Sequence, residues 1–82
     1  MLITIKDFTF EPARPAVAPG TPITVVNKDP ETHTLTATGG KAFDTGKVAS
    51  GQTVTFTAPD KAGSYPFICT FHPYMKGTLT VR

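Results

Sequence analysis

The sequence has no tryptophan and a single cysteine, Cys69, among its 82 residues. One cysteine excludes an intramolecular disulfide, so cysteine usage gives no indication of the compartment. No apolar run is long enough to cross a membrane as a helix. The opening residues, MLITIKDFTFEP, alternate and carry charge early, unlike a secretory signal peptide. We therefore expect either a cytoplasmic protein or the mature form of an exported one.

Charge is also sparse. Eight Lys and Arg stand against six Asp and Glu, a formal net charge of +2, and the basic residues are scattered singly. Without a basic cluster the chain lacks the electrostatic signature of nucleic-acid binding. The lysines at positions 28, 41, 47 and 76 are expected to be solvated surface, with a steering patch for an acidic partner as the alternative.

Proline and glycine are abundant, with eight and seven residues, and they divide the chain into short segments. These segments alternate apolar and polar residues with a period of two, and none shows a helical period. Strands are expected around Leu2–Lys6, Phe8–Phe10 and Val17 and at 22–28, 33–38, 53–58, 64–69 and 77–82. We predict one all-β domain over residues 1–82, an antiparallel Greek-key β-sandwich of about seven strands.

Three local features refine this pattern. A phase slip at Asp7 predicts a bulge or a strand switch. Gly39–Gly40 is expected to end the 33–38 segment, and Phe43 to anchor the loop that follows. Tyr65 and Phe67 are expected to be core aromatic residues, because they share the inward phase of their strand.

The stretch CTFHPYM contains three side chains with soft or borderline metal-binding atoms, Cys69, His72 and Met75. Two residues separate each from the next. On a continued strand Cys69 and His72 would point to opposite faces, so they converge only if the chain leaves the strand after Cys69. Pro73 favours this because it cannot donate to a β-ladder. We expect a tight loop that directs the three donor atoms to one point.

The second histidine, His33, begins the alternating segment HTLTAT on its inward phase. In an antiparallel sandwich that end of a strand can lie beside the strand end that bears Cys69. Two imidazoles, one thiolate and one thioether form the donor set of blue copper sites. Structural zinc sites use several cysteines, and catalytic zinc seldom uses methionine. We predict one copper ion, bound by His33, Cys69, His72 and Met75.

The chain resembles the cupredoxins, the small blue copper proteins that include plastocyanin and azurin. The resemblance runs through FTFEP, VAPGTPITVVNKDPETHT, FDTGKVASGQTVTFTAP and AGSYPFICTFHPYMKGTLTV, and the loop spacing is most similar to that of amicyanin. It implies a type 1 copper site with the same four ligands, and a protein that carries single electrons by Cu(I)/Cu(II) cycling and is not an enzyme. It also implies a periplasmic or extracellular location.

The same resemblance implies that electrons leave through the edge of His72. Transient redox partners, for example a dehydrogenase or a cytochrome, would dock there against an apolar rim of Phe71, Pro73 and Tyr74. Such an interface is expected to be small and weak, and the protein a monomer with neither nucleic-acid partner nor membrane span.

One position departs from the family pattern. Several relatives have asparagine directly after the first histidine, whereas this chain has Thr34. We expect the backbone N–H of Thr34 to donate to the Cys69 sulfur, and the hydroxyls of Thr34 and Thr70 to replace the missing side-chain tie. Asn27 and Asp29 are expected to be turn formers, with a tie between loops as the alternative.

Other interpretations stay open at this point. Each ligand alone has a plainer explanation; a lone buried cysteine, for example, is usually a small hydrophobic residue. A periplasmic copper carrier or storage domain would use the same four ligands but prefer Cu(I). A hydrolase with Cys69 as nucleophile is disfavoured, because the sequence suggests no oxyanion hole and gives Met75 no role.

Overall fold

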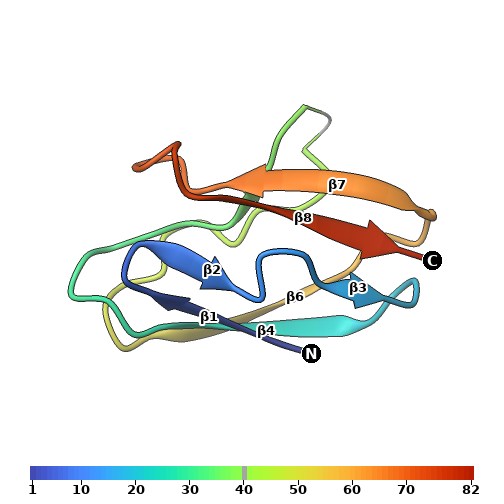
Figure 1. Cartoon of the computed structure of the whole chain (residues 1–82). Coiled ribbons are helices and arrows are strands. Elements are labelled where there is room, and N and C mark those ends of the chain that lie inside the picture. Colours follow the sequence, from blue (N-terminus) through green and yellow to red (C-terminus); the bar gives the residue numbers. More distant parts are fainter. Residues whose placement is uncertain (40) are drawn as a thin grey trace.

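The chain forms two four-stranded sheets that pack face to face (Figure 1), with strand orders β2-β1-β4-β6 and β3-β8-β7-β5. This computed structural model describes residues 1–39 and 41–82. The strands are β1 (Leu2–Lys6), β2 (Thr9–Glu11), β3 (Ala16–Val17), β4 (Pro22–Asn27), β5 (Thr36–Ala37), β6 (Thr53–Thr57), β7 (Gly63–Ile68) and β8 (Lys76–Val81). The predicted all-β sandwich is confirmed.

Both sheets are mixed. β1 pairs with β2, β4 with β6, β5 with β7 and β7 with β8 in the antiparallel sense that the sequence analysis expected. However, β1 pairs with β4 and β3 with β8 in parallel. Parallel neighbours cannot be joined by a hairpin, so the chain between β1 and β4 passes through β2 and through β3 of the other sheet.

Alternation along the strands fills the space between the sheets. Ile3 and Ile5 of β1 and Ile23 and Val25 of β4 are fully buried, as their inward phase predicts. Each such side chain contributes about 1.5–3 kcal/mol through its burial.

Aromatic contacts link the two layers. Phe10 of β2 meets Phe67 of β7 edge to face, with ring centroids 5.0 Å apart. Phe43, buried in the loop between β5 and β6, stacks on Phe56 at 4.9 Å and confirms the predicted anchor. Phe67 is buried, and Tyr65 packs half-buried against the core, as expected.

The phase slip at Asp7 is a tight hairpin, and the predicted bulge or strand switch is wrong. Lys6 of β1 faces Thr9 of β2, which leaves Asp7 and Phe8 as the two turn residues. Their φ angles are 53° and 58°, the left-handed values that a two-residue type I′ turn requires. Non-glycine residues rarely adopt left-handed φ angles, so the residue types at Asp7 and Phe8 did not indicate this turn.

The segment 33–38 is less regular than expected. Only Thr36–Ala37 is a strand, while His33 pairs with Val48 and Thr36 with Asp44 through isolated bridges. Gly40, expected to help end this segment, lies outside the described residues.

Three connections gather at one end of the sandwich, on the left of Figure 1. They are the β1–β2 turn, the loop that leaves β4, and the loop between β7 and β8. None of the residues that the structure describes forms a helix long and apolar enough to cross a membrane.

Candidate metal centre

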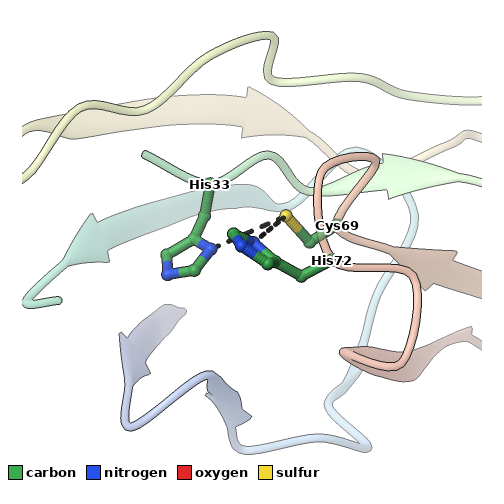
Figure 2. Close-up of side chains that lie close together, drawn as sticks. All are labelled: His33, Cys69 and His72. Carbon is green, nitrogen blue, oxygen red and sulfur yellow. Dashed lines mark hydrogen bonds between the residues drawn. The ribbon is translucent and has the colours of Figure 1, made fainter. Parts of the chain in front are cut away.

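Three of the four predicted ligands meet at this end of the sandwich. Cys69 directly follows β7, His72 lies in the β7–β8 loop, and His33 comes from the connection between β4 and β5. Their ligand atoms all lie within 4.8 Å of one another. Figure 2 shows both rings directed at the Cys69 sulfur, whose Sγ lies 3.6 Å from Nδ1 of His33 and 3.8 Å from Nδ1 of His72.

These separations fit a shared metal ion. A small divalent ion binds imidazole nitrogen at about 2.0 Å and thiolate sulfur at about 2.3 Å. With an angle between the tetrahedral and trigonal values, two such donors stand about 3.6–3.8 Å apart. The observed Sγ–Nδ1 distances fall in this interval. The Cys69 sulfur therefore stands, relative to each histidine nitrogen, at the separation expected of two donors to one ion.

The ligand loop is closed by its own backbone. The N–H of His72 donates to the carbonyl of Cys69 at 3.2 Å, and the N–H of Met75 donates to the carbonyl of His72 at 2.8 Å. The N–H of Cys69 completes the circuit by donating to the carbonyl of Met75 at 3.1 Å. This confirms the predicted tight loop. Met75, the fourth predicted ligand, is buried at its end, with 2% of its surface exposed.

Asp29 holds the ring of His33 from the side away from Cys69. Its Oδ2 lies 2.9 Å from Nε2 of His33, and both side chains are buried. The same carboxylate accepts the backbone N–H groups of Asp7, at 2.7 Å, and Phe8, at 2.9 Å. Asp29 therefore ties the β1–β2 turn to the candidate metal centre. The alternative prediction for Asp29, a tie between loops, is correct.

The charge of Asp29 sets the tautomer of His33. Burial raises the pKa of the Asp29 carboxyl, but the N–H groups of Phe8 and Asp7 and the ring of His33 outweigh it and hold the pKa below its ordinary value. An ionised carboxylate accepts a hydrogen bond from a proton-bearing Nε2, and in the neutral ring the lone pair is then on Nδ1, the atom that faces Cys69.

Asn27 fixes the start of the same loop. Its Nδ2 donates to the carbonyls of Glu31, at 2.7 Å, and Val48, at 2.9 Å, while its Oδ1 accepts the N–H of Asp29 at 2.9 Å. Asn27 is thus a turn former, as predicted, and also a link to the segment that pairs with His33.

Thr34 joins the two ligand segments as the sequence predicts. Its N–H donates to Sγ of Cys69 at 3.4 Å. Its hydroxyl oxygen accepts the N–H of Thr70 at 2.9 Å and lies 3.2 Å from the Thr70 hydroxyl. Two threonines therefore link the segment of His33 to that of Cys69, as the sequence analysis expected.

Phe8 is a site residue that sequence reasoning missed, since the alternation suggested only a strand residue. Its ring meets His33 at 5.1 Å and His72 at 5.0 Å, with interplanar angles of 85° and 84°. The two histidine rings themselves are 5.0 Å apart. Phe8 thus contacts both imidazoles at once.

The surface next to His72 is apolar. His72 is half-buried, whereas Phe71 is 49% and Tyr74 66% exposed, and Pro73 is exposed as well. The ring of Tyr74 lies 6.1 Å from that of His72. The predicted rim residues are therefore exposed beside His72 in the chain, and the ring of Tyr74 lies near the His72 ring.

Comparison with known proteins gives one family. The model of the cupredoxin-like domain matches residues 1–81. A search of the curated proteins finds no match. The fold is similar to a reduced Cu(I) form, at pH 4, of an amicyanin mutant, with a TM-score of 0.90 and 24% identity over 100% of this chain and 81% of that one.

Two further amicyanin mutants give the same result. A reduced form has a TM-score of 0.89 at 24% identity, and a Cu(I) form has 0.89 at 22%, each over 100% of this chain and 81% of that one. At this identity the likeness concerns the fold. The family match and the donor set together indicate one copper ion as the cofactor.

Proposed function

The chain belongs to the cupredoxin-like domain family, and we propose that it is a blue, type 1 copper protein that carries single electrons between redox proteins. The proposed ligands are His33, Cys69, His72 and Met75. The observation that carries the proposal is the convergence of two Nδ1 atoms on one buried sulfur, at 3.6 and 3.8 Å. A weak thioether ligand from Met75, buried at the end of the same loop, would complete the set.

Bound copper would supply a one-electron couple between Cu(I) and Cu(II). The task of the chain is to keep the donor atoms in one arrangement, so that little has to move when the charge changes. Asp29 fixes the ring of His33, and Thr34 links the segment of His33 to that of Cys69. These contacts come from packed parts of the sandwich, which supports a rigid site.

Electrons would pass through the exposed edge of His72. The surrounding rim of Phe71, Pro73 and Tyr74 offers apolar area to a redox partner, and a small interface allows rapid release. We propose a monomer that works in the periplasm or outside the cell and has no catalytic activity of its own.

The test is a titration of the metal-free protein with Cu(II), followed by visible absorption and voltammetry. We expect an intense thiolate-to-copper band that bleaches on reduction and returns on oxidation. Cys69→Ser should abolish the band, and Met75→Leu should keep the colour but shift the potential, since only the weak thioether ligand would be lost. A colourless protein that binds only Cu(I) would contradict electron transfer and favour the copper carrier.

A further inference from the structure

A groove of about 450 Å³ lies against the sheet that carries the ligand loop. Phe67 of β7 and Leu79 of β8 are buried between the sheets, so Pro66, Ile68 and Thr78 face outward by strand alternation. The side chains that line the groove include Arg14, Thr38, Pro66, Ile68, Lys76 and Thr78.

Close packing at Gly77 builds one wall. The carbonyl of Ala13 accepts the N–H of Thr78 at 2.8 Å, which holds Ala13 and Arg14 alongside β8. A Cβ at Gly77 would stand 2.5 Å from the Ala13 oxygen and 2.5 Å from the Phe67 ring. Only glycine permits this approach, so the wall depends on it. On the other side, the N–H of Thr38 donates to the carbonyl of Pro66.

The groove carries positive charge without compensation. Arg14 and Lys76 line it, and among the residues that the structure describes no aspartate or glutamate does. Within residues 1–39 and 41–82, the ion pair that the structure contains is that of His33 with Asp29, so neither cation is engaged by a carboxylate there. Pro66 and Ile68 add apolar surface, and Thr38 and Thr78 add hydroxyls. This chemistry suits a ligand with carboxylates beside an apolar group.

The groove reaches the base of the ligand loop. Ile68, the last residue of β7, pairs with Lys76, the first residue of β8, at the base of the loop. Cys69 directly follows Ile68 and Met75 directly precedes Lys76. An occupant of the groove would therefore lie one residue from two proposed copper ligands.

We propose that this groove docks an acidic segment of a redox partner, in which carboxylates flank an apolar side chain; the assignment of the partner as a redox protein rests on the proposed function. The rim of Phe71, Pro73 and Tyr74 is uncharged and cannot orient a partner by itself, whereas Arg14 and Lys76 can. The volume suits several side chains rather than one carboxylate, within the range of about 300–1,000 Å³ typical of binding sites. Lys76 thus belongs to a steering patch, the alternative that the sequence left open.

The experiment uses a short capped peptide of alternating glutamate and leucine, titrated into the isotope-labelled metal-free protein at low salt. We expect saturable shifts of the backbone amides of Thr38, Ile68, Gly77 and Thr78. The double substitution Arg14→Ala and Lys76→Ala should weaken the affinity by about 5- to 10-fold, because two exposed cations are lost. The matched control, Lys28→Ala with Lys61→Ala, removes the same charge from exposed positions outside the groove and should bind like the wild type.

Three results would overturn the proposal. The first is a set of shifts spread over the surface or centred on Phe71 and Tyr74. The second is equal weakening in the groove variant and in the control, which would mean that net charge alone matters. The third is equally tight binding of free acetate or benzoate, which would make the groove a small-carboxylate site. Because the metal-free protein is used, the titration measures peptide binding to the groove independently of copper. Absence of the blue band in the separate Cu(II) titration would refute only the proposed function.

Discussion

Replacing Asp29 tests the hydrogen-bond network that fixes His33. In Asp29→Asn the side chain keeps its shape but loses its charge, and an NH2 group, which is a donor, replaces one of the two acceptor oxygens. The carboxylate now accepts three hydrogen bonds, from Asp7, Phe8 and His33. A hydrogen bond to a charged group contributes about 1.5–3 kcal/mol, and a buried group left unpaired costs about 1–3 kcal/mol. With at least one donor unpaired and the others weakened, we expect a loss of about 2–4 kcal/mol.

The assay is urea unfolding of the metal-free protein, so that copper binding does not enter the comparison. Asp44→Asn is the control, because its carboxylate also accepts a backbone N–H, from Gly46, but on the exposed surface. That variant should lose less than about 1 kcal/mol. A loss in Asp29→Asn no larger than in the control would refute the reasoning about the buried network.

The same network makes a prediction about pH. The pKa of Asp29 is lower in the folded chain than its ordinary value, so the stability it contributes is present above the ordinary value and is lost as pH falls through the lowered one. The stability difference between wild type and Asp29→Asn should therefore be constant near neutral pH and shrink in acid. A difference that grows as the pH falls would show that the sign is wrong.

Three further substitutions test other parts of the account. Gly77→Ala should destabilise the protein by about 1–3 kcal/mol in urea unfolding, because its Cβ would overlap the Ala13 carbonyl and the Phe67 ring. Phe8→Ala should loosen both imidazoles, which ring-resonance relaxation in the metal-free protein would detect; unchanged rings would show that Phe8 only fills space. Thr34→Val keeps the N–H to Cys69 but removes the hydroxyl that accepts from Thr70, and it should cost about 1–3 kcal/mol; a neutral effect would mean that the tie is unimportant.

The parts of the site that were predictable lie close together in sequence. The spacing of Cys69, His72 and Met75, with Pro73 between them, indicated a loop that directs donors to one point, and the loop closes as expected. The phase of the segment that begins at His33 indicated its inward direction, since strand alternation is a local rule.

What the sequence did not reveal depends on contacts between distant residues. Asp29 accepts hydrogen bonds from Asp7, 22 positions earlier, and from Phe8, 21 positions earlier. Its role depends on a hairpin with left-handed φ angles, which the sequence did not indicate because neither turn residue is a glycine. The parallel pairing of β1 with β4 could not be predicted from the alternation of residues either. A period of two records which face of a strand is buried, but it says nothing about the direction of the neighbouring strand.

The most direct test of the central claim is X-ray absorption at the copper edge of the loaded protein, in both oxidised and reduced states. We predict one short copper–sulfur bond, from Cys69, and two imidazole nitrogens, from His33 and His72, with nearly the same distances in both states. A copper ion without sulfur among its near neighbours would contradict the proposed ligand set. A ligand set that changes on reduction would contradict the proposal of a rigid electron-transfer site.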